Sequence, residues 1–205
     1  MARFKEIYIK SPHPFQRGVQ HGSQVSAEIQ RICQGYRHSF SQKGYRWEEA
    51  KAKAMESVPL LEQTLPDLME EARGIAQGAG VPLPVVMLLN SRYELLKFSK
   101  GEAAKAAPED AECTLYGVEP SASAEGETIV GQNWDNAPFI GEDLYVLHID
   151  EENGTRILAL TEPGQLVRSG MNSHGLGLAC ATLLSTLDRP EAAIPTNFLR
   201  RRLLQ

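Results

Sequence analysis

The sequence lacks the long apolar segments and the excess of positive charge that mark two large classes of protein. No stretch approaches the 18 or more apolar residues of a membrane-spanning helix, and the N-terminal segment has no apolar core typical of a signal peptide. Lysine and arginine total 21 against 26 aspartates and glutamates, which gives a net charge of -5. Phosphate binding requires a basic surface. We therefore expect a cytoplasmic protein that binds neither membranes nor nucleic acid.

Cysteine is scarce as well, with three residues at Cys33, Cys113 and Cys180. The odd count and the absence of a CxxC pair favour free thiols in a reducing compartment over a disulfide framework or a zinc site. The five histidines are dispersed, without the HxxxH spacing that places two ligands on one helix face. We therefore expect no metal and no bound cofactor.

A length of 205 residues with 42% hydrophobic side chains is enough for one sizeable core. The first half has mostly helical patterns. After a short strand at residues 4–10, apolar residues recur at helical spacing in four segments, at 15–36, 47–65, 67–76 and 84–98. Pro66 suits the first turn of the third helix, and Gly78 suits its C-terminal end.

The second half changes to the alternating pattern of strands. Alternation predicts successive antiparallel strands joined by turns, at residues 114–118, 129–135, 144–149, 156–161 and 175–180. A helix begins at Thr196 and carries the basic cluster Arg200-Arg201-Arg202, which we expect to be its solvated side. Because an open sheet face needs a cover, this pattern is that of a fold incomplete at the C-terminus, with more sheet and helix expected after Gln205.

Cys113 is the most informative single residue, because it stands where the two patterns meet. Residues 99–112 have the composition of a loop, and Cys113 opens the first strand after it. A free cysteine is often only a small buried apolar residue. If the chain is cut before Cys113, the residue carries both a thiol nucleophile and an α-amine, whose ordinary pKa of about 7.7–8.0 suits a base. Such a site needs no histidine.

Asn133 and Asp135, near the end of the next predicted strand, are the second set of candidates. Both residue types are depleted in strands, so these two either open the turn before Pro138 or face a site. In the functional interpretation, Asp135 holds the amine of Cys113 and Asn133 orients a backbone group.

The turn at residues 170–176 supplies the third candidate, Asn172. Its simplest interpretation is a Gly/Asn turn that enters a strand. In the functional interpretation, the Asn172 amide donates to an oxyanion, a contact whose loss typically costs about 10²–10³ in rate. A thiol protease with a cysteine–histidine pair is less favoured, because neither His148 nor His174 has a recognisable partner motif.

Five segments in the expected order resemble the acyl-coenzyme A:6-aminopenicillanic acid acyltransferase family, the C45 peptidases of the Ntn hydrolase superfamily. They span nearly the whole chain, and the specific ones are NSRYEL before the cysteine and QNWD after it. The segments are His21-Gly22, Asn90–Leu95, Cys113-Thr114, Gly131–Asp135 and Gly170–Leu176.

The resemblance implies an α+β fold, a four-layer αββα Ntn-hydrolase sandwich, made as a precursor. Residues 1–112 would be a helical pro-segment or α-subunit that packs on the sheet, and residues 113–205 the nucleophile-bearing start of the β-subunit, both in one domain. Cys113 would attack the carbonyl of Glu112 by an N-to-S acyl shift, and hydrolysis would free its amine. The implied catalytic residues are Cys113, Asp135 and Asn172.

The implied activity is that of an amidohydrolase or acyltransferase on small-molecule amides. The mature Cys113 would form an acyl-thioester with an amide or another acyl donor, and water or an amine would take the acyl group. Acyl-coenzyme A is a candidate co-substrate. Asn90, Arg92 and Glu94 match a family motif without an assigned chemistry, and we expect them to form a structural salt bridge or a helix anchor.

Two departures from the family pattern leave an alternative open. Residue 112 is Glu where glycine is common before the cysteine, and family chains continue well past Gln205 with a further asparagine and arginine. The chain is then either part of a longer enzyme or an incomplete, non-catalytic homologue that serves as a binding module or half of an assembly. We expect self-association or association with the missing C-terminal portion.

Overall fold

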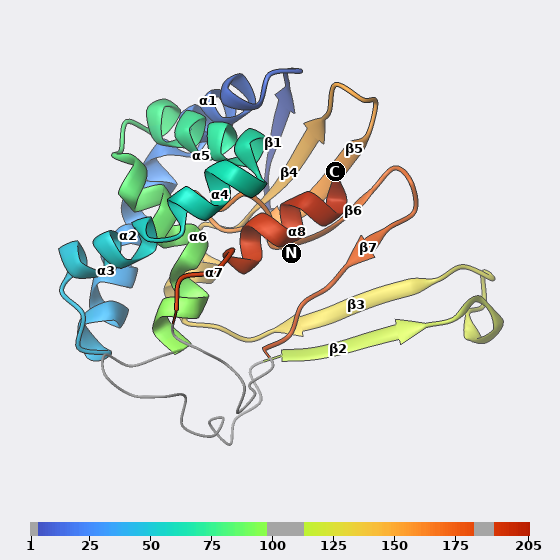
Figure 1. The fold of residues 1–205 in the computed structure, drawn as a ribbon. Helices are drawn as coiled ribbons and strands as arrows, with labels where there is room; N and C mark the ends of the chain where they lie inside the picture. Colours follow the sequence, from blue (N-terminus) through green and yellow to red (C-terminus); the bar gives the residue numbers. More distant parts are fainter. Residues whose placement is uncertain (1–3, 98–112, 183–190) are drawn as a thin grey trace.

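The structure, a computed structural model, describes residues 4–97, 113–182 and 191–205 (Figure 1). The predicted loop at 99–112, including Glu112, lies outside the described residues. The helices are α1 (Pro14–Gln24), α2 (Ser26–Gln42), α3 (Trp47–Met55), α4 (Val58–Thr64), α5 (Pro66–Ala79), α6 (Leu83–Lys97), α7 (Pro138–Gly141) and α8 (Thr196–Leu204), with a 3₁₀ turn η1 (Pro120–Ala122). The strands are β1 (Lys5–Lys10), β2 (Cys113–Val118), β3 (Ile129–Trp134), β4 (Tyr145–Asp150), β5 (Arg156–Thr161), β6 (Ser169–Asn172) and β7 (Gly177–Leu178). The fold is α+β, as expected.

Two of the four predicted helices are each divided in two. The segment at 15–36 breaks at Val25, whose φ of -128° and ψ of 23° are not helical, so that α1 ends and α2 begins there. The segment at 47–65 breaks before Pro59, which lies in the first turn of α4. Proline in a helix interior removes a hydrogen bond and clashes with the preceding turn, so it starts a new helix instead.

The helix α5 ends at Ala79 with Gly80 as its C-cap, and Gly78 lies near that end, as predicted. Gly80 has a φ of +67°, the left-handed conformation that glycine adopts at little cost. Gly78 is needed for packing, because a Cβ atom there would lie 2.2 Å from the carbonyl oxygen of Val19 on α1. The backbones of α1 and α5 therefore pack in direct contact.

The sheet has five strands in the order β1-β4-β5-β6-β7, and a separate ribbon consists of β2 and β3. The strands from β4 to β7 pair antiparallel with their neighbours, as predicted, but β1 pairs parallel with β4. Lys5 lies opposite Tyr145 in this register. The sequence analysis made no prediction for the pairing of β1, because periodicity within a strand carries no information about a partner 140 residues away.

The helices cover one face of the five-stranded sheet (Figure 1). The strands send alternate side chains into this helix-covered core, among them Ile7, Ile9, Leu147, Ile149 and Ile157. On the opposite face the residues Tyr8, Leu158 and Met171 are 54%, 40% and 52% exposed. This sheet face thus exposes large apolar side chains that no described residue covers.

A buried group of charges joins the two halves of the chain beneath α8. Glu71 on α5 accepts hydrogen bonds from Arg17 Nε on α1 at 3.2 Å and from Arg201 Nε on α8 at 3.1 Å. Both arginines also contact Glu151 in the turn between β4 and β5. Burial alone would raise the pKa of Glu71, but the charge and hydrogen bonds of Arg201, together with the charge of Arg17, outweigh it and lower that pKa.

Arg201 therefore corrects one expectation from the sequence. The cluster Arg200-Arg201-Arg202 was expected to be the solvated side of a helix, yet the Arg201 side chain is fully buried. Arg202 is the solvated member and pairs with Asp67 at 2.8 Å. Charge in a sequence predicts exposure unless a buried partner exists, and Glu71 is that partner.

We expect Arg201→Met to lower the free energy of unfolding by about 3–5 kcal/mol, because it leaves the buried carboxylate of Glu71 with one cation fewer. Arg202→Met is the matched control on the next residue, and its loss should stay below about 1 kcal/mol because the pair with Asp67 is exposed. Urea denaturation of the three proteins measures the difference. Equal losses in the two variants would contradict the assignment of the buried network.

Candidate functional site

Cys113 is the first residue of β2 and lies directly opposite Trp134 of β3. Residues opposite each other in an antiparallel pair point to the same face, so the thiol and the indole ring share one side of the ribbon. Asp135 follows Trp134 and so lies at the same end of the ribbon as the amide nitrogen of Cys113. The structure thus brings two of the three predicted site residues, Cys113 and Asp135, to one place. Asn133 lies opposite Thr114, one position further along the ribbon.

Gln132 attaches this ribbon to the larger sheet. Its Oε1 accepts hydrogen bonds from Ser169 Oγ and from the Cys180 backbone N–H, both at 3.0 Å, and its Nε2 donates to the Cys180 carbonyl at 3.2 Å. A two-stranded ribbon alone is marginally stable in water, so these contacts fix the position of Cys113. The sequence analysis quoted Gln132 within the QNWD motif but assigned it no role.

Arg168, which the sequence analysis did not identify, lies beside the same pair. Its guanidinium carbon is 3.8 Å from the centroid of the Trp134 ring. Burial lowers the pKa of Arg168 to about 10, helped by the charges of Arg200 and Arg92, while Glu162 and Cys113 act in the opposite direction. Arg168 therefore stays cationic at neutral pH. The only feature of the sequence that could have drawn attention to Arg168 is a basic residue next to apolar ones.

The segment from Glu162 to Arg168 is held in place by α6. The Asn90 side chain donates to the Gly164 carbonyl and accepts from the Leu166 backbone N–H, both at 2.9 Å. The carboxylate of Glu162 accepts from Arg92 Nε at 3.0 Å. Burial alone would lower the pKa of Arg92, but the charge of Glu162 outweighs it and raises that pKa.

Glu94, the third polar residue of the NSRYEL motif, binds the N-terminal end of α8. Its Oε1 accepts a hydrogen bond from the Thr196 backbone N–H at 2.7 Å and another from the Thr196 hydroxyl. Asn90, Arg92 and Glu94 therefore each anchor a segment of the second half of the chain. The prediction that this motif forms a structural salt bridge and a helix anchor is confirmed.

Asn172, the third predicted catalytic residue, is engaged elsewhere. It is the last residue of β6, and its Nδ2 donates to the Leu204 carbonyl of α8 at 3.2 Å. Its Oδ1 accepts from the backbone N–H groups of His174 and Leu176, both at 3.1 Å. These contacts favour a structural role in a turn. No contact joins it to Cys113 in the part of the chain that the structure describes, and its role as an oxyanion donor stays a prediction.

The histidines considered so far have partners of their own. The imidazole of His21 is hydrogen-bonded to the Tyr145 hydroxyl at 2.5 Å, and burial lowers the pKa of His21 to about 4. Glu71 opposes this shift and Arg201 adds to it. His148 stacks on Tyr8, and His174 lies 3.1 Å from the Thr155 hydroxyl. Within the described ranges, none of these three rings contacts Cys113, so the geometry does not favour a cysteine–histidine pair.

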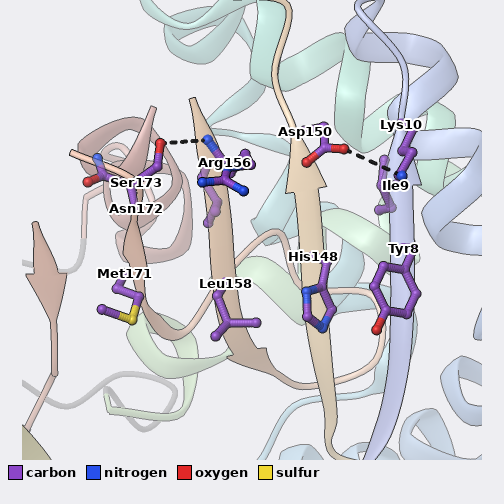
Figure 2. Close-up of a pocket in the computed structure, with 11 residues that line it drawn as sticks. Tyr8, Ile9, Lys10, His148, Asp150, Arg156, Leu158, Met171, Asn172 and Ser173 are labelled. Atoms are coloured by element: carbon purple, nitrogen blue, oxygen red, sulfur yellow. Dashed lines mark hydrogen bonds and ion pairs between the residues drawn. The ribbon is translucent and has the colours of Figure 1, made fainter. Parts of the chain in front are cut away.

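An open hollow of about 550 Å³ lies on the exposed face of the five-stranded sheet (Figure 2). Figure 2 shows Lys10 pointing toward Asp150 across neighbouring strands, with 3.8 Å between Nζ and Oδ2. The lining residues are Tyr8, Ile9, Lys10, His148, Asp150, Arg156, Ile157, Leu158, Met171, Asn172 and Ser173. Cys113 and Arg168 are not among them, so the hollow and the cysteine site are separate.

Two features of the described residues bear on other classes of function. No group of three or more His, Cys, Asp or Glu side chains there could hold a metal ion. Over the same ranges, no single helix combines the length and apolar composition for crossing a membrane. Only α5 and α6 taken together do so, and they meet at a bend of 120°.

Comparison with known proteins finds similarity to one acyltransferase family. A family model described as acyl-coenzyme A:6-aminopenicillanic acid acyl-transferase matches residues 122–205. A curated relative from Emericella nidulans, the "Acyl-coenzyme A:6-aminopenicillanic-acid-acyltransferase 40 kDa form", is 29% identical over 195 residues. The match covers 94% of this chain and 51% of the relative. The chain therefore spans about half the length of this relative.

We expect Gln132→Ala to loosen the β2–β3 ribbon, because it removes the hydrogen bonds to Ser169 and Cys180. Hydrogen–deuterium exchange of the amides in Cys113–Val118 and Ile129–Trp134 should accelerate by on the order of tenfold, a loss of about 1–2 kcal/mol. Gln77→Ala, at an exposed glutamine on α5, is the matched control and should leave the ribbon unchanged. Unchanged exchange in Gln132→Ala would contradict the attachment.

Proposed function

We propose that this chain, which belongs to the acyl-coenzyme A:6-aminopenicillanic acid acyltransferase family, carries the nucleophile of a cysteine amidohydrolase or acyltransferase for small-molecule amides. The observation that carries the proposal is the placement of Cys113 at the first position of β2, opposite Trp134 and at the same end as Asp135. A thiol at a strand end that also holds a carboxylate is the arrangement that an N-terminal nucleophile needs.

The first step of the proposal is self-processing. The Cys113 sulfur attacks the carbonyl carbon of Glu112, the peptide C–N bond breaks, and a thioester replaces it while the nitrogen takes the proton. Water then hydrolyses the thioester, which returns the thiol and leaves Cys113 with a free α-amine. Glu112 lies outside the described residues, so the support for this step is the place of Cys113 and the family.

The second step is acyl transfer. The neutral α-amine takes the thiol proton, the thiolate attacks the substrate carbonyl, and the amine leaving group departs with that proton. Water or a second amine then attacks the acyl-thioester and regenerates the thiol. In the proposed site the Asp135 carboxylate holds the ammonium form of the α-amine. Asp135 follows Trp134, the residue that pairs with Cys113 across the ribbon, and so lies near the start of β2. Acyl-coenzyme A is one thioester that could supply the acyl group.

The four-layer αββα arrangement is part of the same proposal. Helices cover one face of the five-stranded sheet, and the other face exposes Tyr8, Leu158 and Met171 (Figure 1). A second sheet packed against that face would bury these side chains. We propose that the remaining polypeptide of the complete enzyme, or a second copy of the chain, provides this layer.

A second candidate function is that of an incomplete, non-catalytic homologue in a larger assembly. The observation that favours it is the sheet face on which Tyr8, Leu158 and Met171 are exposed. In that case Cys113 would be a structural thiol, and the chain would stay uncut. Processing therefore separates the two candidates before any substrate is known.

We expect the purified protein to separate under denaturing conditions into residues 1–112 and residues 113–205, because the N-to-S shift needs only the Cys113 thiol and the peptide bond that joins Glu112 to Cys113. Cys113→Ala has no sulfur for the attack and should give one uncut chain. Intact mass spectrometry measures both. Cys180→Ala is the control, since the contacts of Cys180 with Gln132 are made by its backbone and should survive. A cut that persists in Cys113→Ala would contradict the proposal.

A further inference from the structure

We propose that Arg168 recognises an anion at the Cys113 site and that this anion is a carboxylate carried by the substrate close to its scissile bond. The inference rests on the proposed function, because it takes Cys113 as the attacking group. It adds the substrate class, namely small amides or thioesters with a carboxylate on the acyl or the amine part.

The first support is geometric. The Arg168 guanidinium stacks on Trp134 with 3.8 Å between the guanidinium carbon and the ring centroid, and Trp134 is the ladder partner of Cys113. Stacking uses the flat face of the guanidinium and leaves its N–H edge free. A carboxylate bound at that edge would belong to a molecule that also reaches the Cys113 sulfur.

The second support is that this buried cation has no partner. Arg168 is only 8% exposed, and its Nε has no hydrogen-bond partner. Across residues 4–97, 113–182 and 191–205, no carboxylate forms an ion pair with it. Arginine is almost never buried without such a partner. The other buried arginines obey this rule, since Arg17 and Arg201 bind Glu71 and Arg92 binds Glu162.

The third support is a surplus of positive charge around Arg168. The charge of Arg200 on α8 disfavours the protonated form of Arg168, as does the charge of Arg92. The Nε of Arg200 is also buried without a hydrogen-bond partner among the described residues. Arg200 Nη1 donates to Asn197 Oδ1 at 3.0 Å, which is a neutral acceptor. The charge of Glu162 offsets this repulsion only in part, because the pKa of Arg168 stays lowered, so a bound anion would stabilise the region.

A pair of alkylating reagents tests this directly. Iodoacetate and iodoacetamide react with a thiolate in the same way, the sulfur bonding to carbon as iodide leaves, but only iodoacetate carries a carboxylate. We expect Arg168→Gln to slow alkylation of Cys113 by iodoacetate about tenfold or more, the size of a charge-assisted contact, with little change for iodoacetamide. Arg168→Lys keeps the charge and should retain most of the iodoacetate rate. Peptide-resolved mass spectrometry of the full chain separates Cys113 from the other thiols.

Arg37→Gln is the matched control, because Arg37 also stacks on a tryptophan, Trp47, in the N-terminal helices. It should change neither rate. Equal slowing by both reagents in Arg168→Gln would mean that Arg168 acts on the thiol itself, and unchanged rates would mean that it binds no anion. Either result overturns the proposal.

Alkylation needs neither cleavage nor turnover, so it distinguishes this proposal from the proposed function. A preference for iodoacetate that depends on Arg168 supports the anion site whether or not the chain is cut. A chain that is cut before Cys113 but shows no such preference would overturn the anion site alone.

Discussion

The buried ion pair between Arg92 and Glu162 is the contact on which the geometry around Cys113 depends. Arg92 comes from α6, in the first half of the chain, and Glu162 follows β5 in the second half. The hydroxyl of Tyr36 on α2 also donates to Glu162, at 2.5 Å. Glu162 is fully buried, so neither partner can be removed without leaving an uncompensated charge in the core.

This ion pair fixes the start of a segment whose end reaches the ribbon. Asn90 holds the middle of that segment through Gly164 and Leu166, and Arg168 at its end stacks on Trp134. The helices of the first half therefore position the ribbon that begins at Cys113. If cleavage before Cys113 occurs, these contacts keep the two fragments together, because they are tertiary and buried.

Local patterns predicted much of this fold, and tertiary contacts account for what they missed. The strands β4 and β5 and the start of α8 follow from alternation and turn residues within a few positions of one another. The parallel pairing of β1 and the burial of Arg201 depend on partners far along the chain. Neither the spacing of apolar residues nor the composition of a single sequence identifies a contact between residues so far apart.

The residues of the candidate site also divide into those that local patterns predicted and those that only tertiary contacts reveal. Cys113 and Asp135 could be named from the sequence because the change of pattern and the QNWD motif are local. Arg168 could not, because its importance lies in a buried Nε that has no hydrogen-bond partner among the described residues, which only the packing reveals. The contacts of Asn172 with α8 are likewise invisible until the helix is placed against the sheet.

If Cys113 attacks an acyl group, an acyl-enzyme should form on its sulfur and can be trapped. The full chain would be mixed with p-nitrophenyl acetate, quenched in acid and mapped by mass spectrometry. We predict one acetyl group on Cys113, removed by hydroxylamine as a thioester should be, and none on Cys33, whose pKa burial raises to about 11. Acetylation absent from Cys113, or equal on Cys113 and Cys180, would contradict the account.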